Sequence, residues 1–180
     1  MTEQNVTRHW YAFKIFFGKG EPIKAYFESQ KLECFYDVVK SVTTKDGKPR
    51  QVSVPVVPTL IFLRSTRYEA EIAERTFLNK IMLYRYVDAS QMKIPAIVSD
   101  REIEIFKIVA NSGVEGLDFY EEYNPKYTKG DKVRVTAGIF KGAEGYVVRI
   151  KGNRHLYVSI KGFCAVTTGY IPKAHLMKIE

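Results

Sequence analysis

At about residue 127 the hydrophobic pattern of the chain changes its period. From there to the C-terminus, polar and apolar residues alternate in short runs such as Lys132-Val133-Arg134-Val135-Thr136. Glycines stand between the runs, as in Lys151-Gly152-Asn153 and Lys161-Gly162. A period of two indicates strands that bury one face, and short strands joined by glycine turns are typical of a small barrel. The sequence therefore predicts a β-barrel for the C-terminal part of the chain.

The part before this change mixes strand and helix patterns. An aromatic and β-branched run from Trp10 to Phe17 predicts a buried strand, and Pro22 suits the first turn of the helix that follows. Lys45-Asp46-Gly47-Lys48 predicts a hairpin turn between two further strands. An α+β sandwich is expected, with helices on a mainly antiparallel sheet. Its order is β-α-β-β-β-α-β-α, with strands near residues 10–17, 35–43, 50–56, 59–63 and 83–87 and helices near 22–32, 68–76 and 99–112.

These patterns divide the chain into four segments. Residues 1–8 form an N-terminal tail, 9–112 the α+β domain, 113–126 an acidic linker and 127–180 the barrel domain. The linker is assigned because neither a helical nor an alternating apolar pattern persists there. Its acidic residues are Glu115, Asp118, Glu121 and Glu122.

The positive charge of the chain is concentrated in the barrel segment. The whole chain has 28 basic and 20 acidic residues, which gives a net charge of +8. Residues 127–180 hold ten basic and three acidic residues, a net charge of +7, whereas residues 113–126 have a net charge of −3. A segment this basic attracts a polyanion or an acidic protein surface, although a polar barrel exterior explains the same composition.

Several classes of protein are excluded by what the sequence lacks. It has no run of ~18 apolar residues for a membrane helix, and its first residues lack a secretion pattern, so we expect a cytoplasmic protein. Cys34 and Cys164 fit neither a metal knuckle nor a disulfide framework. His9, His155 and His175 share no metal-binding or catalytic spacing, and no nucleotide-binding or hydrolase motif occurs. We therefore predict a binding protein with no catalytic residue, metal or cofactor.

Two motifs in a fixed order resemble a known family. The barrel segment resembles the KOW motif in Gly130-Asp131-Lys132-Val133-Arg134-Val135 and Gly138-Ile139-Phe140-Lys141-Gly142-Ala143-Glu144-Gly145-Tyr146-Val147-Val148. The α+β segment resembles the NusG N-terminal (NGN) domain in Trp10-Tyr11, Val57-Pro58-Thr59-Leu60-Ile61-Phe62-Leu63 and Pro95-Ala96-Ile97-Val98-Ser99-Asp100-Arg101-Glu102-Ile103. The two motifs extend from about residue 9 to residue 180. The chain thus resembles a NusG-family transcription elongation factor.

This resemblance implies a fold and a mechanism. The fold is an NGN-type α/β sandwich followed by a small five-stranded SH3-like KOW β-barrel. In the family, an apolar depression on the NGN sheet grips the β′ clamp helices of RNA polymerase, which suppresses pausing and termination, and the KOW domain recruits a second partner. The positions that match the polymerase contact are Tyr11, Phe13, Val57, Pro58 and Leu60.

The chain departs from the housekeeping members of the family at two places. They usually read Phe-Pro-Gly-Tyr where this chain has Val57-Pro58-Thr59-Leu60, which reshapes the depression without making it polar. They also place Phe before the glycine where this chain has Lys161-Gly162-Phe163, on the face used for NusE or Rho. Both departures favour an operon-specific antitermination paralogue, similar to RfaH or to the UpxY factors of polysaccharide operons.

Two further sets of residues are candidates for binding. Such paralogues are recruited through nucleic acid on a paused polymerase, either non-template DNA or nascent RNA. The matching candidates are Lys19, Lys24, Arg75, Asn79 and Lys80. On the barrel, the candidates for RNA or for a protein partner, including the ribosome through NusE, are Arg134, Lys141, Arg149, Lys151, Lys161 and Phe163. For each set, a solvated polar surface is the alternative interpretation.

Other function classes stay open at this point. A ribosome- or RNA-binding KOW protein without polymerase contact explains the basic barrel but leaves the NGN-like sheet unused. An enzyme with a dispersed site is a third class. We expect a monomer in the cytoplasm.

Overall fold

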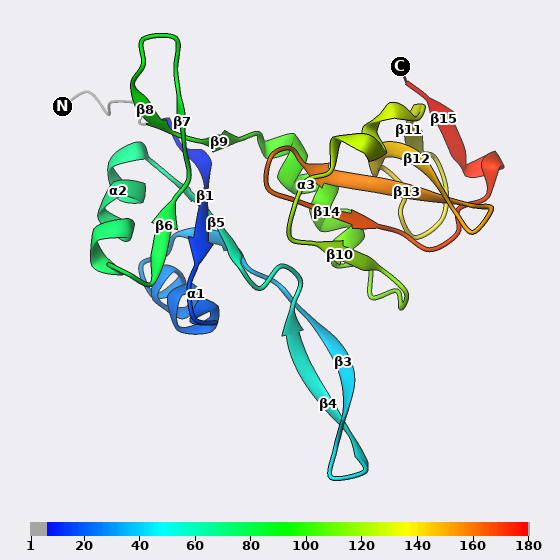
Figure 1. Cartoon of the computed structure of the whole chain (residues 1–180), viewed down its shortest axis with the longest axis horizontal. Coiled ribbons are helices and arrows are strands. Elements are labelled where there is room, and N and C mark those ends of the chain that lie inside the picture. The colour runs from blue at the N-terminus through cyan, green and yellow to red at the C-terminus, as the bar shows by residue number, and fades with distance from the viewer. Residues whose placement is uncertain (1–6, 180) are drawn as a thin grey trace. The chain divides into compact units, whose positions relative to one another are not determined.

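The computed structural model describes residues 7–179, apart from the side chains of residues 39–41, 45 and 53. These residues form two compact units, which we describe separately (Figure 1). Unit 1 consists of residues 7–37 and 57–100, and unit 2 of residues 38–56 and 101–179. Residues 38–56 and 101–112 thus group with the C-terminal strands. The tail predicted for residues 1–8 lies mostly outside the described residues.

Unit 1 is built on strand β1 (His9–Ile15), which pairs with three other strands. All three are antiparallel to it: β5 (Leu60–Ser65), β6 (Ile81–Leu83) and β9 (Ile97–Val98). On its other side, β5 pairs with β2 (Glu33–Phe35). Strand β1 is therefore central, and five of its seven residues are buried. The strand predicted from Trp10 to Phe17 extends two residues too far, because β1 ends at Ile15 and Phe17 is exposed.

Two helices cover one face of this sheet. Helix α1 (Gly20–Ser29) contributes Ile23 and Phe27 to the core, and helix α2 (Arg67–Thr76) contributes Ala70 and Ala73. These side chains pack with odd-numbered residues of the strands in one hydrophobic cluster. Beyond the sheet, β7 (Arg85–Val87) and β8 (Lys93–Pro95) form a separate two-stranded ribbon.

Unit 2 contains a six-stranded antiparallel sheet in the order β10-β14-β13-β12-β11-β15. It also holds the ribbon of β3 (Val38–Lys45) and β4 (Lys48–Pro55), and nearly all of helix α3 (Asp100–Ala110). The strands of the sheet and two short 3-10 helices are β10 (Asp118–Tyr120), η1 (Pro125–Lys129), β11 (Lys132–Val135), β12 (Glu144–Ile150), β13 (Asn153–Ile160), β14 (Cys164–Thr167), η2 (Lys173–His175) and β15 (Leu176–Lys178).

This architecture confirms the predicted α+β class, with an NGN-type unit and a β KOW-like region. The KOW-like sheet has six strands rather than the five expected, because β10 lies within the predicted linker and pairs with β14. The aromatic residues of this segment explain the difference. Tyr120 and Tyr123 pack against the buried side chain of Tyr157, whose hydroxyl accepts a hydrogen bond from the Asn124 N–H at 2.9 Å.

Gly145 shows why the glycines of the KOW-like motif are needed. It lies in β12 opposite Val133 of β11, and it is buried. A Cβ atom at this position would overlap the backbone carbonyl oxygen of Tyr157 on β13. The neighbouring strand comes this close only because the position has no side chain.

We predict that Gly145→Ala lowers the free energy of unfolding by roughly 1–3 kcal/mol, because the new methyl group pushes against backbone that cannot rotate away. Urea unfolding followed by circular dichroism measures the change. Gly169→Ala is the matched control, since a Cβ there meets no atom within 4 Å. Equal stability of the two variants would contradict the proposed close approach.

Candidate functional site

The residues predicted to contact polymerase do not share one face of the sheet. Tyr11 and Phe13 lie opposite Leu63 and Ile61 of β5, and all four belong to the cluster beneath α1 and α2. Tyr11 is 3% exposed and Phe13 is fully buried. Alternation along β1 turns both side chains into the core, so neither offers surface to a partner.

Leu60 lies on the second face of the sheet, opposite Lys14 of β1. Along β1, the even-numbered residues occupy this face, and Trp10 and Ala12 are buried there. Leu60 itself is 3% exposed, and Val57 is buried as well. Of the five predicted residues, only Pro58 has an exposed side chain.

One end of the second face nevertheless remains accessible. Lys14 is paired with Leu60 on one side and with Met82 of β6 on the other. Met82 is 41% exposed, Lys14 is half-buried, and Pro58 lies two residues before Leu60. We call Lys14, Pro58, Leu60 and Met82 the open end of the second face. Alternation along β1 is enough to place Lys14 on the second face. No local pattern in the sequence predicts that Met82 lies there as well.

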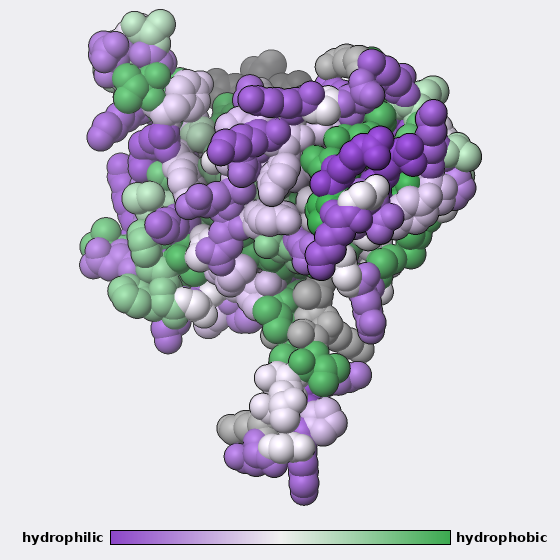
Figure 2. All heavy atoms as spheres, turned by 45° about the vertical axis from the view of Figure 1, so that its right-hand side comes forward, coloured by the Kyte–Doolittle hydropathy of each residue, from purple (hydrophilic) through white to green (hydrophobic). Residues whose placement is uncertain are grey.

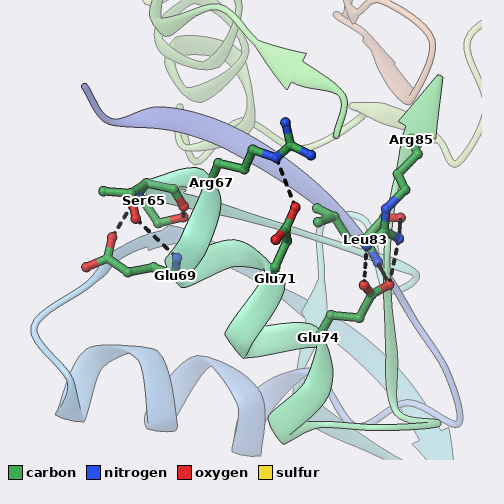
Figure 3. Close-up of polar contacts among 8 residues, drawn as sticks. Ser65, Arg67, Glu69, Glu71, Glu74, Leu83 and Arg85 are labelled. Atoms are coloured by element: carbon green, nitrogen blue, oxygen red, sulfur yellow. Dashed lines mark hydrogen bonds and ion pairs between the residues drawn. The ribbon is translucent and has the colours of Figure 1, made fainter. Parts of the chain in front are cut away.

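A polar network fixes helix α2 and the strand that carries Met82 (Figure 3). The helix begins with a capping box, in which the Glu69 N–H donates to the Thr66 hydroxyl and the Thr66 N–H donates to the Glu69 carboxylate. Near its C-terminal end, Glu74 Oε1 accepts hydrogen bonds from the Leu83 N–H at 2.7 Å and from Arg85 at 3.0 Å. The hydrogen bond from Arg85 lowers the pKa of Glu74 and so keeps the carboxylate charged. The network thus holds β6 against α2 immediately beside Met82.

The predicted nucleic-acid contacts lie in part on two adjoining loops of unit 1. The Phe16 N–H donates to the carbonyl oxygen of Lys80 at 2.9 Å, which joins the loop after β1 to the loop before β6. Lys19 belongs to the first loop, and Asn79 and Lys80 to the second, and all three are exposed. Arg75 is exposed in the last turn of α2, whereas Lys24 is half-buried and lies 4.0 Å from Glu28.

The same loops expose two large apolar side chains that the sequence analysis missed. Phe17 is 85% exposed and Leu78 is 70% exposed. Phe17 also has a positive φ of 58°, a backbone conformation that is uncommon for an aromatic residue. An exposed aromatic ring among lysines can stack on a nucleobase while the cations attract phosphates. The sequence predicts Phe17 in a buried strand and assigns Leu78 to no element, so only the structure identifies both as exposed.

The candidate KOW contacts form more than one group. Arg149 pairs in register with Arg154 on neighbouring strands, and Lys151 lies in the turn that joins those strands. Lys141 is exposed in a separate turn. Arg134 is held in an ion pair with Glu144 at 2.7 Å, and Phe163 is half-buried. Lys161 is exposed, and its backbone N–H donates to Glu102 of α3 at 3.1 Å.

Helix α3 and the six-stranded sheet line an open cavity of about 230 Å³ within unit 2. Glu144 at its wall accepts hydrogen bonds from both Arg134 and Arg101, and its side chain is only 9% exposed. Burial alone would raise the pKa of Glu144, but the two guanidinium groups outweigh it and lower the pKa. The cavity is lined by Arg101, Glu102, Ile105, Tyr123, Thr128, Lys132, Glu144, Gly145, Tyr146, Tyr157, Ser159 and Lys161.

The two cysteines have different surroundings. Cys164 is completely buried in β14, and this burial raises the pKa of its thiol to about 12. Cys34 is half-buried in β2 of unit 1. Within residues 7–179, no group of three His, Cys, Asp or Glu side chains is arranged to hold a metal ion. None of the helices formed by these residues has the length and apolarity needed to cross a membrane.

Comparison with protein families gives a match over residues 8–107, more than half of the chain. The matching family is described as transcription termination factor nusG. The chain belongs to the NusG family. A comparison with curated protein sequences gives no match. As a member of the NusG family, the chain is a transcription factor.

The NusG match covers every strand of unit 1, the β3–β4 ribbon and most of α3. The six-stranded sheet follows the matched range, so its assignment as a KOW-like region depends on the Gly130–Val148 motif and on its β structure. The open end of the second face and the two basic loops both lie within the matched range.

We predict that Glu144→Gln lowers the free energy of unfolding at pH 7 by about 1–3 kcal/mol, because it removes the charge that two arginines share. The folded-state pKa of Glu144 is below the ordinary value of 4.5, so this stabilisation is present above that pH. It is lost as the pH falls through the lowered folded-state pKa. The free energies of unfolding of the wild type and the variant should therefore converge as the pH falls below 4.5.

Urea unfolding at several pH values measures this difference. Asp131→Asn is the control, because Asp131 and its ion-pair partner Lys178 are both well exposed and contribute less than ~1 kcal/mol. A difference in free energy of unfolding between wild type and Glu144→Gln that does not shrink as the pH falls below 4.5 would show that the carboxylate charge is not the cause.

Proposed function

We propose that this NusG-family protein is a transcription elongation and antitermination factor that binds RNA polymerase through the open end of the second face. The observation that carries the proposal is the arrangement of Pro58, Leu60 and Met82 around Lys14 on adjoining strands. Met82 and Pro58 offer exposed apolar surface beside the buried Leu60, which suits the tip of a helical hairpin such as the polymerase clamp helices. The proposed contact thus replaces Tyr11 and Phe13 with Lys14 and Met82.

Three finer assignments belong to the same proposal. The KOW-like sheet recruits a second partner through its basic turns, with NusE on the ribosome or Rho as candidates. The Val57-Pro58-Thr59-Leu60 segment supports an operon-specific paralogue rather than a housekeeping factor. The protein acts by binding rather than by catalysis, as a monomer in the cytoplasm.

We predict that Met82→Glu weakens binding of the full chain to core RNA polymerase by tenfold or more. The substitution removes a side chain whose burial contributes ~1.5–3 kcal/mol and places a charge in an apolar contact. Biolayer interferometry with core polymerase from the same organism measures the affinity. Because Met82 is exposed in the unbound protein, the variant should keep the wild-type circular dichroism spectrum.

Ile72→Glu is the matched control for this experiment. Ile72 lies on α2, away from the second face, and its exposure of 37% is close to that of Met82. Equal affinity of Met82→Glu and wild type would overturn the proposed surface. Co-sedimentation of the wild type with ribosomal subunits at moderate salt, without polymerase binding, would favour a ribosome-binding KOW protein instead.

A second proposal concerns the two basic loops around Phe17, Lys19, Asn79 and Lys80. We propose that they hold single-stranded nucleic acid exposed on the transcribing polymerase, with non-template DNA and nascent RNA as the two sources. An exposed ring and lysines on adjoining loops support this assignment. Lys24 contributes less to nucleic-acid binding, because Glu28 lies within ion-pair distance of it.

We predict that Phe17→Ala weakens binding of a 12-nucleotide single-stranded DNA by about tenfold, because one stacked base contributes ~1–3 kcal/mol. Fluorescence anisotropy of the labelled strand measures the change. Tyr68→Ala is the control, since Tyr68 is a similarly exposed aromatic residue of unit 1 on α2. Loss of the same size in both variants would indicate that Phe17 has no specific role.

A further inference from the structure

The ribbon formed by β3 and β4 has exposed surface on both faces. It is a two-stranded sheet of its own, with eight residues in each strand. Among its described side chains none is buried, and every one described from residue 42 to residue 51 is exposed. A single two-stranded hairpin gains little stability from its own contacts. Both faces of this ribbon are therefore available to a partner.

The ribbon is also strongly basic. Its 18 residues contain four cations, Lys40, Lys45, Lys48 and Arg50, against the single acidic residue Asp46, which gives a net charge of +3. Lys48 and Arg50 make no ion pair with any described residue, and both are exposed. In Figure 2 the ribbon lies at the bottom of the view, with hydrophobic surface toward its base and hydrophilic surface at its tip. The charge complementarity points to a polyanion at the tip.

The two faces of the ribbon differ in chemistry. Lys48 and Arg50 lie two positions apart on β4 and so share one face, with Thr43 directly opposite Arg50. The other face carries Val42, which is 67% exposed and lies opposite Gln51. Cations and hydroxyl groups on one face suit phosphate oxygens, and an exposed valine suits thymine methyl groups.

The dimensions of the ribbon match one groove of a nucleic acid. Its eight paired residues extend about 26 Å at ~3.3 Å per residue, and its two backbones lie ~4.8 Å apart. The major groove of B-form DNA is ~12 Å wide and accepts a two-stranded β-ribbon with its side chains. The major groove of duplex RNA is too deep and narrow for this.

At the tip of the ribbon the chain reverses direction in a tight two-residue turn. Asp46 and Gly47 both have positive φ values, 54° and 72°, as a type I′ turn requires. Pro49 is the second residue of β4, and Pro55 ends that strand. Because proline has no N–H, the outer edge of β4 lacks donors at these positions, which disfavours the addition of a strand from another protein.

We propose that the β3–β4 ribbon binds double-stranded DNA by entering its major groove, with Lys48 and Arg50 on the phosphates. The partner is identified by its charge, its groove width and its helical form. The contact is separate from the single-strand site around Phe17, and it does not depend on the polymerase surface.

The test uses the full chain and a 24-base-pair DNA duplex, with affinity measured by fluorescence anisotropy at several salt concentrations. The variant is Lys48→Gln with Arg50→Gln. We expect the slope of log affinity against log salt to fall by about 1.8, because each lost phosphate contact removes ~0.9. Guanine N7 lies in the major groove, so the wild type should protect it from methylation and the variant should not.

The matched control is Lys126→Gln with Lys129→Gln, two exposed cations of η1 in the same unit. This control removes the same charge as the ribbon variant. If the slope of log affinity against log salt falls equally in both double variants, the DNA is attracted by net charge alone and the proposal is overturned. An unchanged slope for the ribbon variant would overturn it too, as expected if the ribbon binds an acidic protein instead. Equal binding of duplex RNA of the same sequence would exclude entry into the major groove.

Discussion

The pairing of β1 with three strands at once is the constraint on which unit 1 depends. It fixes the register of β5, β6 and β9 relative to one another, and with it the face on which every side chain of these strands lies. One face takes the aromatic rings that pack under α1 and α2. The other brings Lys14, Leu60 and Met82 together from three separate segments of the chain. The candidate polymerase surface is thus a product of strand register rather than of any single motif.

Unit 2 depends on close backbone approach and on one shared carboxylate. Gly145 allows β12 and β13 to lie close together, and its neighbour Glu144 binds an arginine from β11 and an arginine from α3. The two features are adjacent in the sequence, so one short segment sets both the packing of the sheet and its attachment to the helix. Of the candidate partner-binding residues, Lys141 and Lys151 lie in turns outside this packing, whereas Arg134 takes part in it.

The sequence alone predicted most of the elements, because their signals are local. Pro22 in the first turn of α1, the Asp46-Gly47 turn and the glycine turns of the KOW-like region are all signals from residues close in the chain. The face occupied by Tyr11 and Phe13 could not be derived in this way, since it depends on which strands pair with β1. The same holds for β10, whose acidic sequence resembles a linker and whose strand exists because Tyr120 and Tyr123 pack on Tyr157. The apolar run from Trp10 places Phe17 in a buried strand, whereas β1 ends at Ile15 and Phe17 is exposed with a positive φ.

The contrast between the two cysteines has a practical consequence. Cys164 is completely buried in β14, and its pKa is raised to about 12. Its thiol therefore carries almost no thiolate at neutral pH and is not accessible to reagents. Cys34 retains some solvent access in β2. Of the two thiols, that of Cys34 is therefore the one to test for labelling with a maleimide dye or a spin label. Binding of polymerase or of nucleic acid can then be followed by spectroscopy without engineering either thiol.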